Sequence, residues 1–271
     1  MALTLDLDQA LHVARDAAAA AGEIITHYWR RGVVAERKAD DTPVTAADRE
    51  AETAIREVIL ATFPNHAILG EEAGRVGHGT ALWLVDPLDG TRSFVRRTPF
   101  FSTQIALMLD GELVLGVSAA PVYGETFWAR RGGGAYFDGA RVRVADTADL
   151  ARTSLSIGNV ATLARGDGWA RLGALLQQVE RCRGLGDFCH YHLLARGALD
   201  AVVESDVNIL DIAALSVIVR EAGGFFTDLN GCAPGLDTTS VLAATPALHP
   251  LLLQHLTQNP SARGTLQSPH A

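Results

Sequence analysis

The chain is poor in cysteine: it contains 3 among 271 residues, and no two of them form a CxxC pair. Cys182, Cys189 and Cys232 leave a thiol unpaired under any scheme, which excludes a disulfide framework and is typical of a reducing compartment. We expect all three to be small core residues. The sequence also lacks a long uncharged apolar stretch and a basic or apolar leader, which argues against a membrane span and a secretory signal. A cytoplasmic protein without membrane partners is therefore expected.

Positive charge is also scarce, because 23 Lys and Arg face 31 Asp and Glu for a formal net charge of -8. No run of basic residues could track a phosphate backbone, so nucleic-acid binding is not expected. The GxxxxGK[ST] loop of NTPases is missing, and Gly184 and Gly186 lack the third glycine of a dinucleotide fingerprint. What the chain does have is 48% hydrophobic residues, enough for a substantial globular core.

The first half of the chain is expected to start with two helices and to continue as a sheet. Apolar residues at helical spacing predict a helix from Asp6 to about Trp29, and a capping box at Thr45 and Asp48 starts a second helix that ends near Thr62. Asp and Gly at 110–111 predict a hairpin turn. The predicted strands cover residues 66–69, 81–85, 103–109, 112–122, 127–130, 135–137 and 141–144.

The order of predicted elements changes near Leu150, where helices become more frequent. The predicted elements are helices at about 167–182, 187–196 and 211–222 with a strand at 201–204, followed by further strands and a last helix. We expect one domain over residues 1–258, made of two packed halves at about 1–150 and 151–258. Residues 259–271 are rich in Pro, Ser and Gln and are expected to form a flexible tail.

Carboxylates stand where predicted strands and helices begin or end. Glu71 and Glu72 follow one strand, Asp86 and Asp89 follow the apolar strand ALWLV, and Asp211 opens a helix. Such positions border the crevice in which ligands bind to layered folds. A donor set of oxygen atoms alone suits a hard cation such as Mg²⁺, whereas zinc prefers nitrogen and sulfur.

The segment DPLDGT adds a candidate anion site to the carboxylates. Gly90 permits a close turn, and residues 91–93 are expected to expose free amides at a helix start, where phosphate groups bind. A phosphate there would lie beside a metal held by Asp86 and Asp89. The combination predicts metal-assisted chemistry at phosphorus.

Ordinary structural roles compete with several of these interpretations. Acidic residues near turns commonly cap helices, and Asp48, three residues after Thr45, could merely complete a capping box. His190 and His192 could suggest zinc, but on a helix they point to different faces, so a core or surface role is expected. The glycines at 132–134 are expected to connect a hairpin, since no helix start follows them.

Several blocks together resemble the inositol monophosphatase family of Mg²⁺-dependent, lithium-sensitive phosphatases. They are DTPVTAADREAE (41–52), GEE (70–72), WLVDPLDGT (83–91) and ILDIAALSVIVREAGG (209–224), and the resemblance covers nearly the whole chain. It implies an α+β fold, a layered αβαβα sandwich of the inositol monophosphatase/fructose-bisphosphatase type. A homodimer is also implied.

The resemblance also assigns roles to residues of this chain. Asp48 with Thr91 would orient the attacking water, Gly90 and Thr91 would bind the phosphate, and Glu72 would support the ligands. The family usually carries Trp before the last aspartate, and Leu210 in that place is expected to alter packing rather than metal binding. Roughly two or three Mg²⁺ ions would be held by Glu71, which is also assigned a catalytic role, Asp86, Asp89, Asp211 and the backbone carbonyl of Leu88.

The substrate is expected to be a small phosphate ester with a cationic leaving group. DGTRSF (89–94) and the segment 98–129 resemble the histidinol-phosphatase branch. Asp187 replaces a small neutral residue, and Glu204 matches a substrate-contacting glutamate, so both would face the leaving group with Asp89 and Asp211. The ammonium and imidazole of L-histidinol would gain charge-assisted hydrogen bonds there. A Mg²⁺-dependent histidinol-phosphatase of histidine biosynthesis is therefore expected.

Three alternatives stay open at this point. The substrate could be inositol 1-phosphate or a broader range of sugar phosphates. Asp187 could instead cap a helix that starts at Phe188. A binding or regulatory protein could keep the fold without turnover, although the intact carboxylates argue against it.

Overall fold

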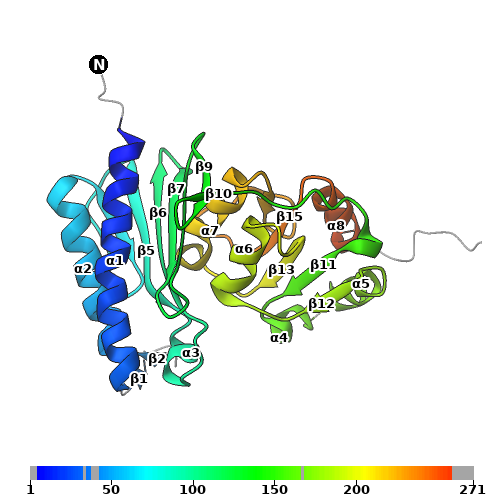
Figure 1. Cartoon of the computed structure of the whole chain (residues 1–271), viewed down its shortest axis with the longest axis horizontal. Coiled ribbons are helices and arrows are strands. Elements are labelled where there is room, and N and C mark those ends of the chain that lie inside the picture. The colour runs from blue at the N-terminus through cyan, green and yellow to red at the C-terminus, as the bar shows by residue number, and fades with distance from the viewer. Residues whose placement is uncertain (1–4, 33–34, 38–42, 166–167, 258–271) are drawn as a thin grey trace, which may run out of the picture.

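The computed structural model describes residues 5–32, 35–37, 43–165 and 168–257. Within these, the elements stack as helix, sheet, helix, sheet and helix layers, as Figure 1 shows from left to right. This arrangement confirms the predicted α+β sandwich. The predicted tail, residues 259–271, lies outside the described residues. No helix within them is long and apolar enough to cross a membrane.

The first outer layer consists of helices α1 (Leu7–Arg31) and α2 (Ala46–Thr62). The Asp6 side chain caps the first turn of α1, and Gly32 ends the helix with a φ of 83° that glycine adopts without strain. The buried face of α1 is mostly alanine, so the helix packs closely on α2 and on the sheet beneath it. α1 starts where the helical spacing predicted, and α2 starts where the capping box at Thr45 predicted.

The first sheet has eight strands in the order β10-β9-β8-β7-β6-β5-β3-β4. β5 lies near its centre, parallel to β3 and antiparallel to β6. The hairpin between β6 and β7 turns at Asp110 and Gly111, both with positive φ, as predicted. The strands are β3 (Ala67–Gly70), β4 (Gly74–Val76), β5 (Ala81–Asp89), β6 (Ser102–Leu109), β7 (Glu112–Ala120), β8 (Glu125–Arg130), β9 (Gly134–Phe137) and β10 (Ala140–Val142).

The middle layer consists of α6 (Asp187–Ala195) and α7 (Ile209–Glu221), which lie between the two sheets. α7 is buried on nearly every side, which explains why its sequence is apolar throughout and shows no amphipathic pattern. Its N-terminus therefore enters the interior between the sheets. Any polar side chain in its first turn is held at the junction of the two halves.

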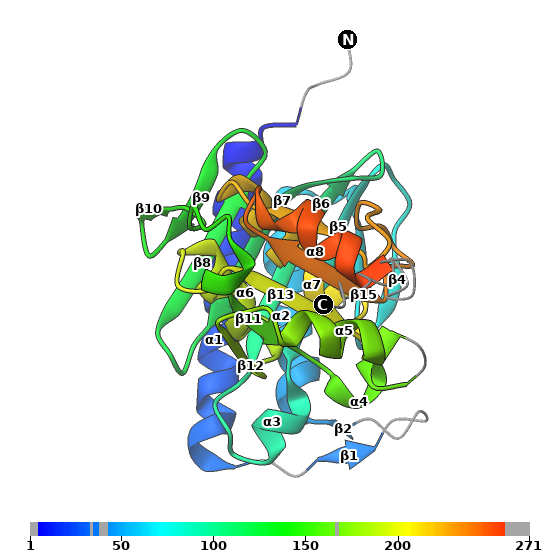
Figure 2. The ribbon, with the colours of Figure 1, turned by 90° about the vertical axis from the view of Figure 1, so that its right-hand side faces the viewer.

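The second sheet has five strands in the order β12-β11-β13-β15-β14. Helices α5 (Gly168–Leu176) and α8 (Leu248–Thr257) cover its outer face, as Figure 2 shows. Its strands are β11 (Ser154–Ile157), β12 (Arg181–Arg183), β13 (Ala201–Ser205), β14 (Phe225–Thr227) and β15 (Ser240–Ala244). The short elements are β1 (Glu36–Arg37), β2 (Pro43–Val44), α3 (Thr91–Val95), η1 (Leu150–Arg152) and α4 (Val160–Leu163).

The structure differs from the sequence prediction in the second half. The helix predicted to reach Cys182 ends at Leu176, and residues 181–183 form the edge strand β12 instead. The charged residues of this strand suit a sheet edge that faces solvent. Because two of its three residues are arginines, the sequence pattern did not indicate a strand. Strand β11 was not predicted. All strands of the first sheet precede residue 150 and those of the second follow it, while the division into two halves stays a prediction.

The cysteines also differ from expectation, because none of them is a fully buried core residue. Cys182 and Cys189 are half-buried, and Cys232 is exposed. All three are free thiols.

Candidate active site

A bulge in strand β5 brings two acidic side chains to one place. Asp86 pairs with Gln104 of β6, and Asp89 pairs with Ser102, so three steps along β5 match two along β6. In a regular strand, residues three apart point to opposite faces. The extra residue of the bulge cancels one alternation, so Asp86 and Asp89 share a face. Pro87 within the strand is the sequence signal that could have revealed this bulge.

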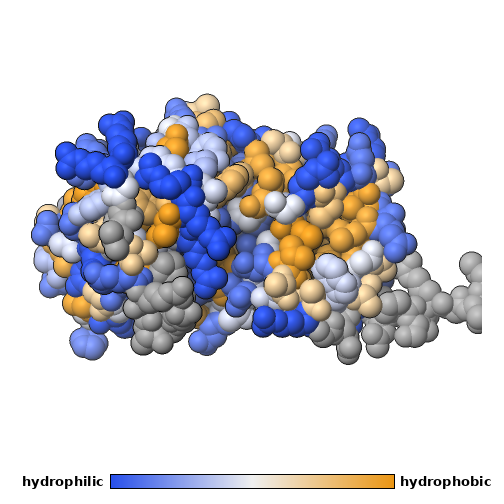
Figure 3. Space-filling view, turned by 90° about the horizontal axis from the view of Figure 1, so that it is seen from below, coloured by the Kyte–Doolittle hydropathy of each residue, from blue (hydrophilic) through white to orange (hydrophobic). Residues whose placement is uncertain are grey.

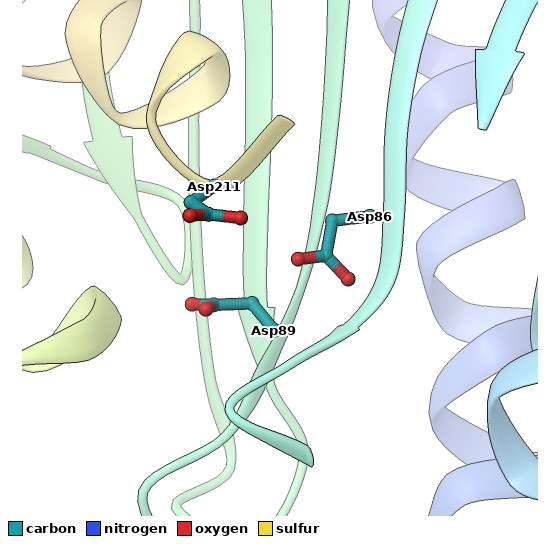
Figure 4. Close-up of side chains that lie close together, drawn as sticks. All are labelled: Asp86, Asp89 and Asp211. Atoms are coloured by element: carbon teal, nitrogen blue, oxygen red, sulfur yellow. The ribbon is translucent and has the colours of Figure 1, made fainter. Parts of the chain in front are cut away.

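Asp211 completes an acidic cluster from the first turn of α7. The carboxylate oxygens of Asp86, Asp89 and Asp211 lie within 4.8 Å of one another, and Figure 4 shows the three side chains turned toward a common point. Asp211 forms a capping box with Asn208, since its Oδ2 accepts the Asn208 amide at 3.0 Å. α7 begins at Ile209, two residues before the predicted start, so Asp211 lies inside the helix.

The loop that carries Glu71 and Glu72 is held by a buried residue of α2, and the charge of Glu71 acts on Asp86. The carboxylate of Glu52 accepts the backbone amides of Glu72 at 2.7 Å and Ala73 at 3.0 Å. Gly70 is required beside it, because a Cβ there would lie 2.5 Å from the Glu52 carboxylate. Sequence analysis assigned no role to Glu52. Its position one helical turn after Asp48 is the signal that could have found it.

Burial and mutual repulsion make the acidic cluster hold protons more tightly than free carboxylates do. Burial, followed by the charges of Glu71, Asp89 and Asp211, raises the pKa of Asp86 well above its usual range. Burial and the charges of neighbouring acids likewise raise the pKa of Asp89. Burial raises the pKa of Asp211 to about 6, against the hydrogen bonds from Asn208. A cation at the common point would relieve this repulsion.

The donor set fits Mg²⁺ on chemical grounds. The side chains that converge here offer oxygen donors: the carboxylates of the cluster, with Glu71 close enough to influence Asp86. Leu88, between Asp86 and Asp89 in the sequence, adds a carbonyl oxygen that accepts the Thr91 hydroxyl at 3.0 Å. Hard divalent cations prefer such oxygens. Within the described residues, the three aspartates are the one group of His, Cys, Asp or Glu found with metal-binding spacing.

We predict that Mg²⁺ stabilises the protein more at pH 7.5 than at pH 5.5. The raised pKa values mean that the metal-free fold binds protons better than the unfolded chain, a stabilising contribution that is lost as pH rises through about 6. Mg²⁺ must displace these protons, so its affinity rises over the same window. At 100 times Kd the gain is about 2.7 kcal/mol, on the order of 5 to 10 °C in Tm. Thermal unfolding with and without Mg²⁺ measures this change in Tm at each pH. Equal changes in Tm at pH 5.5 and pH 7.5 would contradict the prediction.

Asp48 has both of the roles considered for it. Its Oδ2 accepts the Thr45 amide at 2.8 Å and the Thr45 hydroxyl at 2.6 Å, which completes the capping box of α2. Its Oδ1 accepts the Thr91 hydroxyl at 2.9 Å. Burial raises the pKa of Asp48 despite these donors. The carboxylate is thus oriented by its cap while one oxygen stays directed at Thr91.

Gly90 occupies a position that only glycine fits. It precedes the short helix α3 with a φ of 87°, and a Cβ there would lie 2.4 Å from the Phe100 carbonyl oxygen. The backbone therefore turns sharply directly after Asp89. This places the Thr91 hydroxyl 2.9 Å from Asp48 and starts α3 two residues after Asp89.

Asp187 and Glu204 meet in a small cleft beside the cluster. The cleft is lined by Asp89, Asp211, Asn159 and Tyr191 as well as by these two acids. Burial and the charge of Glu204 raise the pKa of Asp187 to about 6. α6 starts at Asp187 itself, Gly186 is its cap residue, and this helix start has no side-chain cap hydrogen bond. The structure thus overturns the alternative in which Asp187 caps a helix from Phe188.

The other candidates of the sequence have structural roles. His192 is buried and lies 2.7 Å from the Ser118 hydroxyl, whereas His190 points to Glu204, so the two histidines do not converge. Leu210 is buried in the core between the sheets, as expected for a packing role. The glycines at 132–134 connect β8 to β9 as a hairpin, as predicted.

A groove larger than the cleft of Asp187 and Glu204 lies away from this site. It measures about 1410 Å³ and lies between α1 and strands β7 and β8. None of the clustered carboxylates lines it. Figure 3, which views the molecule from below, shows polar side chains between the two halves and apolar ones gathered over the second half. Size therefore does not identify the active site here, whereas convergent carboxylates do.

Three comparisons relate the chain to known proteins. The model of the inositol monophosphatase family matches residues 6–261. A histidinol-phosphatase of Mycobacterium tuberculosis is 41% identical over 82% of this chain and 87% of that protein, and an inositol-1-monophosphatase of Mesorhizobium japonicum is 34% identical over 81% and 85%. The crystal structure of the extragenic suppressor protein suhB from Bartonella henselae matches with a TM-score of 0.85 and 30% identity, over 93% of this chain and 99% of that one.

Proposed function

Because this chain belongs to the inositol monophosphatase family, we propose that the phosphomonoester it hydrolyses is L-histidinol phosphate, as a step of histidine biosynthesis. The chain is a phosphomonoesterase of that family. The observation that carries the choice of substrate is the meeting of Asp187 and Glu204 beside the acidic cluster. These two carboxylates add negative charge on the side where the leaving group would lie.

The chemistry of the cleft favours a cationic leaving group. L-Histidinol has a primary ammonium and an imidazole, and both can donate hydrogen bonds to carboxylates. Charge-assisted contacts of this kind are worth about 1.5 to 3 kcal/mol each. A neutral inositol ring would gain less from a second acid. Asp89 and Asp211 line the same cleft, so the leaving group would lie close to the proposed metal ligands.

The relatives support this substrate and also name the main alternative. The histidinol-phosphatase of M. tuberculosis is more similar than the inositol-1-monophosphatase of M. japonicum. The alternative, inositol 1-phosphate or a broader range of sugar phosphates, is favoured by the fact that Glu204 already accepts hydrogen bonds from His190 and Tyr191. Asp187 has no hydrogen-bond partners of this kind at the start of α6. Asp187 is therefore the residue that favours L-histidinol phosphate over inositol 1-phosphate.

Residues of this chain suit the Mg²⁺ that the family resemblance implies. We propose that Glu71, Asp86, Asp89, Asp211 and the Leu88 carbonyl hold roughly two or three Mg²⁺ ions. When bound, Mg²⁺ supplies an activated water and charge stabilisation at the phosphoryl and leaving oxygens. The convergence of the three aspartates and their raised pKa values support this assignment. We propose in addition that the protein is a homodimer, as the family resemblance implies.

Asp48 and Thr91 would orient the attacking water. The Thr91 hydroxyl lies 2.9 Å from Asp48 and 3.0 Å from the Leu88 carbonyl, and its one hydrogen can serve only one of them fully. The Leu88 carbonyl would be free to hold the metal if the hydroxyl donates to Asp48, and the hydroxyl oxygen could then accept from the water. The first amides of α3, after Gly90, would bind the phosphoryl oxygens.

We predict that Asp187→Asn raises KM for L-histidinol phosphate by about tenfold, with kcat changed by less than about threefold. The substitution removes a charge that faces the leaving group but leaves the cluster intact. KM for inositol 1-phosphate should stay the same. The control is Asp146→Asn, which removes one charge from an exposed position. An unchanged KM for histidinol phosphate would remove Asp187 from substrate recognition. Steady-state phosphate release gives KM and kcat for the wild type and for both variants.

A further inference from the structure

We propose that Ser156, His190 and Tyr191 are positioning residues that fix the Glu204 carboxylate for the leaving group. The inference rests on the proposed function and extends it to residues that do not belong to the metal site. Ser156 lies on β11, the two aromatic residues lie on α6, and Glu204 lies on β13. The ligand of this arrangement is the cationic alcohol portion of the substrate, not its phosphate.

One oxygen of Glu204 is fully engaged by two donors. Glu204 Oε2 lies 3.0 Å from His190 Nε2 and 2.6 Å from the Tyr191 hydroxyl. His190 is 0% exposed, Tyr191 1% and Glu204 4%. Buried charged groups of this kind keep a single geometry because each lost donor leaves a carboxylate lone pair unsatisfied. Neither donor reaches Oε1, so Oε1 is the oxygen that can accept from a ligand in the cleft.

Ser156 supports the form of His190 that donates to Glu204. The Leu185 amide donates to the Ser156 oxygen at 3.3 Å, and the Ser156 hydroxyl, 3.2 Å from His190 Nδ1, can donate its own hydrogen to that nitrogen. The Glu204 carboxylate can only accept, so the ring carries a hydrogen on Nε2. That hydrogen points to Glu204. The chain of donors thus runs from a backbone amide through Ser156 and His190 to the carboxylate.

The backbone at Gly158 also restricts the position of Glu204. A Cβ at Gly158 would lie 2.0 Å from Glu204 Oε1, so glycine makes room for the carboxylate at the end of β11. The next residue, Asn159, lines the same cleft. Glu204 is therefore held between β11 and α6, in one orientation at the edge of the cleft. A preorganised carboxylate binds a cation without first losing its own freedom.

Ser156, His190 and Glu204 have the composition of a hydrolytic triad but cannot act as one. Ser156 is 0% exposed and lies on the side of the histidine ring away from Glu204 and the cleft. A nucleophile must contact the substrate. The arrangement therefore acts through Glu204, and its effect should appear in KM rather than in kcat.

Ser156→Ala and its matched control test the proposal. Ser118 makes the same kind of buried contact, at 2.7 Å, with His192 on the same helix, but the other nitrogen of that ring faces Glu125. We expect Ser156→Ala to raise KM for L-histidinol phosphate about five- to twentyfold with kcat within about threefold. Ser118→Ala should leave both within about twofold. Tm and Mg²⁺ titration of each variant check that the fold and the metal site are retained.

Conservative substitutions separate positioning from packing. His190→Gln can keep an N–H donor near Glu204 and does not depend on a tautomer, so KM should stay near the wild-type value, and adding Ser156→Ala should then have no further effect. His190→Leu should raise KM as Ser156→Ala does. Tyr191→Phe keeps the buried ring and removes one donor, which should also raise KM.

The outcomes distinguish this inference from the proposed function. If Ser156→Ala, His190→Leu and Tyr191→Phe all leave KM within about twofold, or if Ser118→Ala raises KM equally, the positioning role is wrong. If the wild type hydrolyses inositol 1-phosphate and not L-histidinol phosphate, the proposed substrate is wrong. The same variants are then measured on inositol 1-phosphate, where a rise in KM alone supports positioning of Glu204 and an unchanged KM overturns it.

Discussion

Asp89→Asn is expected to lower kcat by at least about a thousandfold at saturating Mg²⁺, a loss of about 4 kcal/mol of transition-state stabilisation. Asp89 faces Asp86 and Asp211 only because of the bulge in β5, and it also lines the cleft for the leaving group. By the proposed assignment, an amide in its place removes a charge that the metal and the substrate would share. The shape of the side chain is retained, so the fold should persist.

The matched control for this prediction is Asp110→Asn. Asp110 lies in the β6–β7 turn with a φ of 49°, a conformation that asparagine adopts as readily as aspartate. Its substitution should leave kcat within about twofold. Phosphate release measured over a range of Mg²⁺ separates weakened metal binding from lost catalysis. Wild-type turnover by Asp89→Asn would contradict the metal assignment.

Thr91→Ala is expected to lower kcat by about 100- to 1000-fold while KM changes little. In the proposed mechanism the hydroxyl, which donates to Asp48, links that carboxylate to the attacking water, so its removal would leave the water without an oriented partner. Asp48→Asn should lower kcat by a similar factor. Because the two act as one unit, the double variant should be no worse than the single ones by more than about threefold.

Thr91→Ser is the control for the hydroxyl group. It keeps the oxygen and removes only the methyl group, so most of the activity should return. Stopped-flow or steady-state phosphate release measures the whole series under one Mg²⁺ concentration. If Thr91→Ala retained wild-type kcat, or if the losses of the two single variants multiplied in the double one, the shared role of Thr91 and Asp48 would be wrong.

The sequence predicts those parts of the fold that depend on local signals. The capping box at Thr45 and the hairpin at Asp110 were predicted because their signals lie within a few residues of the structure they specify. The apolar strand 81–85 was predicted as well, but its extension through Asp89 was not. Pro87 breaks the simple pattern there, and only pairing with β6 shows that the strand continues through a bulge.

Other features depend on contacts between distant residues, which no local pattern can show. Ser156 and His190 are 34 residues apart, and His190 and Glu204 are 14 apart, yet they form one chain of hydrogen bonds. Sequence reasoning assigned His190 a core or surface role, which its burial bears out without showing what it contacts. The edge strand β12 was mistaken for helix because pairing with β11, and not its own composition, makes it a strand.

The most direct test of the central claim is the ratio of kcat/KM for L-histidinol phosphate to that for D-myo-inositol 1-phosphate, measured side by side on the wild-type protein with Mg²⁺ and with EDTA. The two additional carboxylates of the cleft predict a preference of at least about tenfold for histidinol phosphate, and loss of both activities in EDTA. A preference for inositol 1-phosphate would contradict the proposed substrate. Turnover that persists in EDTA would contradict the metal mechanism.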